Sequence, residues 1–217
     1  MSQVRSNRRS PIIIALVSAG LLAWPTLGLA QTVAGQAEAV QATVLGTTTV
    51  LAGTGALSGA SDALEASSIA GSVPSLLSAD SLHAASIGSP DQAYSEASLG
   101  SLGMSLAGNT ISVDFLMARA LQVTGASGIG TSEIDGLTIN GVPVPVSGTA
   151  NQVVPLIGGT LIINEQQIGA AGALVSALHI IVSGVADVVI ASASAGAPPS
   201  SSSTLPPLPA VPLPGLP

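Results

Sequence analysis

The fold is decided by one stretch in the middle of the chain, Ile111-Ser-Val-Asp-Phe-Leu-Met-Ala-Arg-Ala-Leu-Gln-Val-Thr124. Its odd-numbered positions are apolar apart from Arg119, whereas Ser112, Asp114 and Gln122 fall on even-numbered positions. An alternation of period two is typical of a strand with one buried face, because successive side chains point to opposite sides. We therefore predict a strand over residues 111–124 whose odd-numbered face lies in the core.

A hairpin is predicted immediately after this strand. Asn140-Gly141 follows the apolar run Leu137-Thr138-Ile139 and precedes another apolar residue. Asn-Gly readily adopts the two positive φ angles of a type I′ turn. Pro143 and Pro145 lie two residues apart, so both missing N–H groups face one side, which fits an edge strand.

The last part of the domain is also interpreted as strands. A second hairpin is expected at Gly158-Gly159, joining residues 153–157 to residues 160–164. Residues 168–186 carry no charge, yet they alternate in hydropathy and include glycines, serines and a histidine, which favours strands over a membrane span. The expected faces carry Leu178, Ile180 and Val182 on one strand and Val185, Asp187, Val189, Ala191, Ala193 and Ala195 on the next.

Alternating strands with frequent glycine turns predict an all-β fold, a single antiparallel β-sandwich-like domain of two packed sheets. A β-solenoid is the alternative, because strands rich in alanine and serine stack tightly. No repeat period is evident over residues 39–108, where alternation is weak and strand propensity is low.

Composition restricts the function. The 217 residues include 34 alanines, 30 serines and 25 glycines, with only 7% charged and 1% aromatic residues. No lysine is present, which excludes Walker-type phosphate loops and Schiff-base chemistry. The basic residues are Arg5, Arg8, Arg9 and Arg119, so nucleic-acid binding is not expected.

Residues 1–30 are predicted to be a signal peptide. Three arginines precede an apolar stretch from Ile12 to Trp24, and Gly28-Leu29-Ala30 forms a small-x-small cleavage site. The alternative is an uncleaved N-terminal anchor, because residues 11–30 carry no charge. Cleavage would leave one basic and eleven acidic residues, a net charge of −10, and no transmembrane span. We therefore expect an acidic protein that is secreted or located at the cell surface.

The remaining chain divides into two parts. Residues 31–196 form the β-rich domain, and residues 197–217 form a tail rich in proline and serine. We predict that this tail is disordered and extended, because its prolines can neither pair within a sheet nor continue a helix.

Three segments in a fixed order carry a family resemblance. They are Gly136-Leu-Thr-Ile-Asn-Gly-Val142, Gly159-Thr-Leu-Ile-Ile-Asn-Glu-Gln166, and Ala177-Leu-His179 followed by Ala186-Asp-Val-Val-Ile-Ala-Ser-Ala193. In this order and spacing the chain resembles the choice-of-anchor P family, secreted bacterial proteins in which a β-rich domain precedes differing surface anchors. The match is best over residues 105–196 and looser over residues 35–104. The resemblance implies an extracytoplasmic, surface-associated protein, and the family has no established activity to carry over.

Candidate functional side chains are few. A Ser/His/Asp triad could be drawn through His179, Asp187 and one of many serines, but a packed or hydrogen-bonded structural histidine is favoured. Asn164, Glu165 and Gln166 could ligate Ca²⁺ with Asp135 or Asp187, or could instead hydrogen-bond to loop backbone. The alternation places Arg119 in the core, where an unpaired guanidinium is costly, so we predict a partner, Glu165 or Asp187. The alternative is that Arg119 lies where the strand emerges into solvent.

These observations favour a secreted or cell-surface structural or adhesion-type protein without catalytic residues, metal or cofactor. Its partners would be components of the cell envelope or surface, or further copies of the same chain. An extracellular module that binds glycans or Ca²⁺ is the alternative, and a secreted hydrolase is a third possibility.

Overall fold

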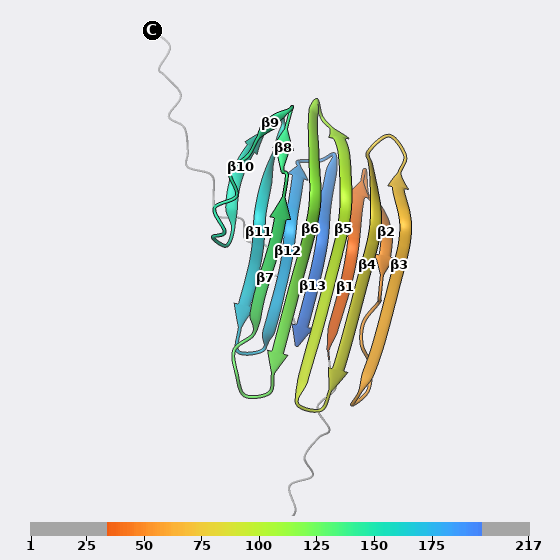
Figure 1. Ribbon diagram of the computed structural model, residues 1–217, viewed down its shortest axis with the longest axis vertical. Coiled ribbons are helices and arrows are strands. Elements are labelled where there is room, and N and C mark those ends of the chain that lie inside the picture. Colours follow the sequence, from red (N-terminus) through yellow and green to blue (C-terminus); the bar gives the residue numbers. More distant parts are fainter. Residues whose placement is uncertain (1–33, 197–217) are drawn as a thin grey trace, which may run out of the picture.

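A computed structural model describes residues 34–196, which form two antiparallel sheets packed face to face (Figure 1). The predicted all-β sandwich is confirmed, and the solenoid alternative is wrong, because the strands form two separate antiparallel sheets rather than stacked coils. The predicted signal peptide and proline-rich tail lie outside the described residues. No helix in the described part of the chain is long and apolar enough to cross a membrane.

Sheet A has six strands in the order β10-β11-β12-β13-β1-β2. Their bounds are β1 (Gly35–Val44), β2 (Thr47–Gly53), β10 (Gln152–Leu156), β11 (Gly159–Gly169), β12 (Gly172–Val182) and β13 (Ala186–Gly196). The predicted strands of the C-terminal third therefore form most of one layer, and the N-terminal hairpin β1–β2 completes it.

Sheet B has the order β3-β4-β5-β6-β8-β9. The additional strand β7 pairs with residues 115–121 of β6, whereas β8 pairs with residues 111–112 of β6. Its strands are β3 (Asp62–Val73), β4 (Leu77–Ser89), β5 (Gln92–Leu106), β6 (Asn109–Val123), β7 (Ile129–Asp135), β8 (Thr138–Ile139) and β9 (Val142–Pro143). The strand predicted over residues 111–124 is β6, and the predicted Asn-Gly hairpin joins β8 to β9 with φ angles of 52° at Asn140 and 75° at Gly141. Long strands also cover the region where alternation is weak.

The strands carry a feature that the alternation rule did not predict. Midway along both sheets, regular pairing skips one position, and the side chains of each strand that crosses this level change faces. In sheet A, for example, the consecutive residues Ala39 and Val40 are both buried. We call the skipped positions the reversal row: Asn164, Ala177, Ala191, Ala39 and Ala52 in sheet A, and Ile69, Ser81, Ser101 and Asp114 in sheet B.

The reversal row has a backbone cause. Five of its nine positions are non-glycine residues with positive φ, namely Ala52, Ala191 and Asn164 on alternate strands of sheet A, and Ser81 and Ser101 on the neighbouring strands β4 and β5 of sheet B. A left-handed residue turns the backbone so that the next side chain leaves on the same face as the previous one. Each sheet therefore consists of two halves with opposite side-chain phase.

Two predicted faces are wrong for this reason. Beyond Asp114 the buried residues of β6 are Leu116, Ala118 and Ala120, so Arg119 lies on the outer face. In β13, Asp187 and Val189 face outward, whereas Ala191, Ala193 and Ala195 are buried. The prediction assumed that side chains alternate regularly along the whole strand, whereas the backbone reverses their faces at the reversal row.

The reversal row also divides the core by size. On one side the core consists mainly of large aliphatic residues, among them Leu102, Ile111, Ile163, Leu178, Ile180 and Ile190. On the other side alanine dominates, with Ala93, Ala97, Ala118, Ala173, Ala193 and Ala195. The hydroxyl groups of Ser86 and Ser95, both fully buried, form a hydrogen bond of 2.9 Å at the alanine-rich end.

Small side chains bring the sheets close together at the alanine-rich end. A Cβ atom on Gly128 would lie 2.5 Å from the carbonyl of Gly172, and one on Gly130 would lie 2.3 Å from Cγ2 of Val175. Only glycine fits the backbone contact at Gly128, and a Cβ on Gly130 would require the side chain of Val175 to move. The high alanine and glycine content of the chain therefore serves close packing of the two sheets.

Candidate functional site

One imidazole lies between two carboxylates on the outer face of sheet A. Nδ1 of His179 lies 2.8 Å from Oε2 of Glu165, and Nε2 lies 3.0 Å from Oδ1 of Asp187. The side chain of His179 is 15% exposed, that of Glu165 is 22% exposed and that of Asp187 is 58% exposed. The structure thus brings together three of the residues singled out in the sequence, one from each of β11, β12 and β13.

The reversal row makes this contact possible. Ile162 pairs with His179 on the outer face, so regular alternation along β11 would direct Glu165 into the core. The reversal at Asn164, where φ is 53°, places Glu165 on the outer face within reach of the imidazole. Asp187 reaches His179 from β13, the neighbouring strand on the other side. It lies two residues before Val189, the residue of β13 that pairs with His179.

Burial disfavours the charged form of His179, but the hydrogen bonds and negative charges of Glu165 and Asp187 outweigh it. The pKa of His179 is therefore raised above its usual value. When the ring is protonated, both nitrogens donate hydrogen bonds to carboxylates. The three side chains, which we call the imidazole clamp, then tie three strands together by charge-assisted hydrogen bonds.

This geometry bears on the Ser/His/Asp alternative. A general base must present a free ring nitrogen to the hydroxyl group that it deprotonates. In the imidazole clamp, carboxylates occupy both nitrogens of His179, so neither is directed at a serine. The arrangement resembles a structural crosslink more closely than a nucleophile-activating triad.

Asn164 and Gln166, beside the clamp, bind protein groups. Oδ1 of Asn164 accepts hydrogen bonds from Oγ of Ser132 and Nε2 of Gln166, and its Nδ2 donates to the carbonyl of Gly148. Asn164 is buried and lies in the reversal row, so its amide fixes a left-handed backbone position. The bond to Gly148 reaches the backbone of the loop between β9 and β10, as in the structural interpretation, whereas the other two bonds join side chains.

The calcium hypothesis finds no support in this arrangement. Among residues 34–196, no group of three or more His, Cys, Asp or Glu side chains is placed to hold a metal ion. The imidazole of His179 separates Glu165 from Asp187, and Asp135 lies on β7 in the other sheet. Calcium prefers six to eight oxygen ligands around one centre, which these side chains do not surround.

Arg119 has a different partner and a different location from those predicted. Its Nε donates a 2.6 Å hydrogen bond to Oε2 of Glu96 on the outer face of sheet B, and neither Glu165 nor Asp187 contacts it. Its side chain is 46% exposed, so the expected burial is wrong, while the expected pairing with a carboxylate is correct. The hydrogen bond to Glu96 raises the pKa of Arg119 further.

A tyrosine completes this second cluster. The hydroxyl of Tyr94 donates a 2.6 Å hydrogen bond to the same oxygen, Oε2 of Glu96. Burial, the hydrogen bond to Glu96 and the carboxylate charge raise the pKa of Tyr94 to about 12. Burial disfavours the charged form of Glu96, but the bonds from Tyr94 and Arg119 prevail and lower its pKa.

Sequence reasoning missed Glu96 and Tyr94, although a signal was available. Ala107-Gly108 forms the two-residue turn between β5 and β6, with φ angles of 50° and 79°. A tight turn at that position fixes the register and places Glu96 directly opposite Arg119. An Ala-Gly turn is a weaker signal than Asn-Gly, because alanine adopts positive φ at a cost.

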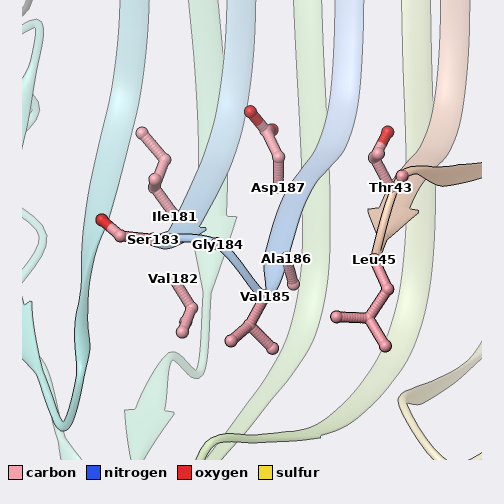
Figure 2. Close-up of a pocket in the computed structure, with 10 residues that line it drawn as sticks. Thr43, Leu45, Ile181, Val182, Ser183, Gly184, Val185, Ala186 and Asp187 are labelled. Atoms are coloured by element: carbon pink, nitrogen blue, oxygen red, sulfur yellow. The ribbon is translucent and has the colours of Figure 1, made fainter.

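A hollow lies at the turn between β12 and β13, near the imidazole clamp (Figure 2). Figure 2 shows Asp187 and Thr43 on one side of it and Val182, Val185 and Leu45 on the other. The hollow is open and mainly apolar, and its convergent polar groups are few. It lacks the enclosed shape and the directed polar groups that small-molecule sites usually combine.

Comparison with family models, with curated proteins and with solved structures finds no match. The proposed function therefore rests on the sequence and on the contacts of the described residues.

Proposed function

We propose that this chain is an exported, non-catalytic structural or adhesive protein of the bacterial cell surface, related to the choice-of-anchor P proteins. The observation that carries the proposal is how the described residues use their basic side chains. Arg119, His83 and His179 each pair with a carboxylate on a neighbouring strand of the same sheet. These guanidinium and imidazole groups, which are the ones best suited to catalysis, thus link neighbouring strands on the outer faces of the sheets.

Charge supports the same proposal. Without residues 1–30 the chain has a net charge of −10, which disfavours binding to nucleic acid and anionic lipid. The outer faces present mainly small polar and aliphatic side chains, such as Ser98, Thr131 and Val189. Faces of this kind suit lateral packing against other surface components.

Export is tested by expressing the whole chain in a bacterial host and fractionating the cells. We expect a mature protein that begins at Gln31, as read by mass spectrometry, and that protease added to intact cells degrades. An unprocessed chain confined to the cytoplasm would contradict the proposal. Removal of residues 197–217 in a second version measures whether the tail retains the protein at the cell.

Adhesion is tested by incubating the purified processed chain with intact cells and with isolated cell-wall glycans. The proposal expects binding to cells that free sugars do not displace. Saturable binding to a defined glycan would instead favour the carbohydrate-binding alternative. Hydrolysis that His179→Ala abolishes, with an unchanged melting temperature, would favour the hydrolase and overturn the proposal.

A further inference from the structure

The two sides of the sandwich differ in how their edge strands end the sheets. On one side, β2 ends sheet A and β3 ends sheet B, and within residues 34–196 each pairs with a single neighbour. These two edges lie side by side at the right of Figure 1. Close packing confirms this, since a Cβ on Gly71 of β3 would lie 3.1 Å from Cδ1 of Leu51 on β2. We call this side the open side.

The opposite side is protected against strand addition. Sheet A ends there in β10, a five-residue strand that contains Pro155. Sheet B ends in two separate pieces, β9 with Pro143, and β7 with Glu133 and Asp135. Prolines, charges and short strands are the usual means by which proteins prevent edge-to-edge pairing.

The open side has none of these protections over most of its length. β2 contains no proline and no charge, and β3 carries its only charges, Asp62 and Glu65, within its first four residues. The remaining eight residues of β3 are uncharged, and Ile69 among them is 90% exposed. In a chain this acidic, an uncharged edge is the place where a second acidic copy can approach without strong repulsion.

We propose that two copies of this chain pair antiparallel through their β3 strands and form a two-fold dimer. Antiparallel pairing places Asp62 and Glu65 of each copy beside the uncharged end of the other, whereas parallel pairing would place like charges side by side. The two-fold axis of this dimer is perpendicular to the sheets, so the β2 edges of the two copies face each other in sheet A. Because the opposite side is protected, assembly stops at two copies rather than continuing into a fibre.

The size of the open side is sufficient for such a contact. Twelve residues of β3 span about 40 Å at the rise of an antiparallel strand. Two sheets with their outer side chains are roughly 20 Å deep. The side therefore offers on the order of 800 Å² per copy, which is the usual size of a specific protein interface.

The first test measures the mass of the purified processed chain by analytical ultracentrifugation over a range of concentrations. We expect a mass near twice that of one chain, falling to one chain on dilution. Ile69→Asp places a charge near the partner's β3 carboxylates and should weaken dimerisation at least tenfold. The matched control is Val153→Asp on β10, which also replaces an edge residue that is 61% exposed and should change dimerisation less than twofold.

A second test uses the absence of cysteine from the chain. Ser68→Cys lies near the proposed axis and should form a disulfide-linked dimer under mild oxidation, whereas Val153→Cys should not. A monomer at all concentrations, polymers larger than two chains, or equal crosslinking of both variants overturns the inference. These results are independent of cell location, so they can fail while the proposed surface function stands, and the reverse is also possible.

Discussion

Arg119 lies directly opposite Glu96 across the β5–β6 hairpin, and its Nε donates a 2.6 Å hydrogen bond to Oε2 of that carboxylate. The same oxygen accepts a hydrogen bond from the hydroxyl group of Tyr94. The three side chains therefore form one electrostatic unit, in which the guanidinium and the phenol share a single carboxylate oxygen. The coupling between these groups can be measured, because Tyr94 is the only tyrosine of the chain.

The ionisation of Tyr94 should respond in opposite directions to changes at its two neighbours. In the unmodified protein, ultraviolet absorbance of tyrosinate should titrate with a pKa of about 12. Glu96→Gln removes the negative charge and the charged acceptor, so the pKa should fall toward the ordinary value near 10. Arg119→Gln removes a positive charge that favours tyrosinate, so the pKa of Tyr94 should rise.

Circular dichroism recorded on the same samples checks that the sheets persist at high pH. A fall of similar size in both variants would show that Tyr94 senses general loosening of the strands, and would refute the shared-oxygen arrangement.

The imidazole clamp predicts how stability depends on pH. The pKa of His179 is higher in the folded chain than in the unfolded chain, where it is near 6.5. Its stabilising contribution is therefore fully present below about pH 6.5 and is lost as pH rises through the folded-state pKa. Urea unfolding of the unmodified protein should show a decline in free energy across this window, and His179→Gln should remove that decline.

His83→Gln is the matched control for this measurement. The side chain of His83 is more exposed, at 38%, and its Nδ1 lies 3.7 Å from Oε1 of Glu65. Its replacement should leave the decline in place. A pH dependence that survives in His179→Gln but disappears in His83→Gln would refute the assignment to the clamp.

The fold class was predictable because it depends on features that local sequence carries. The alternation of β6 and the Asn140-Gly141 turn each indicate strands without knowledge of their neighbours. The faces were not predictable beyond the reversal row. Ser101 and Ala191 adopt positive φ, and neither serine nor alanine signals this conformation in a sequence.

The sequence singled out the residues of the imidazole clamp, but it did not predict the contact between Glu165 and His179 or the partner of Arg119. His179, Glu165 and Asp187 were singled out from segments of one meander, β11–β12–β13, and short connections keep such strands adjacent. The partner of Arg119 was sought in those segments, whereas it lies on β5 and is fixed by the turn at residues 107–108. Pairing could be inferred only where the connecting turn was recognised.

Close approach of the sheets predicts a large difference between two nearby glycines. Gly128→Ala should destabilise the fold by about 1–3 kcal/mol, because the new Cβ would lie 2.5 Å from the carbonyl group of Gly172, and backbone cannot move aside easily. Gly169→Ala should be neutral or stabilising, since no atom lies within 4 Å of the added Cβ. Chemical denaturation of both variants measures the difference, and equal effects would show that the sheets are not in close contact there.

The strain in the reversal row predicts opposite effects for two serines of the same strand. Ser101 has a φ of 49°, which costs an L-residue about 1–2 kcal/mol relative to ordinary strand backbone, and glycine avoids this cost. Ser101→Gly should therefore stabilise the protein by roughly 0.5 kcal/mol after the greater unfolded-state entropy of glycine is subtracted. Ser105 is also exposed on β5 but has ordinary strand geometry, so Ser105→Gly should destabilise by about 0.5–1 kcal/mol. Thermal unfolding of the two variants side by side decides the matter. Destabilisation by both substitutions would mean that the left-handed position at Ser101 is not strained, and that the change of faces in β5 has another cause.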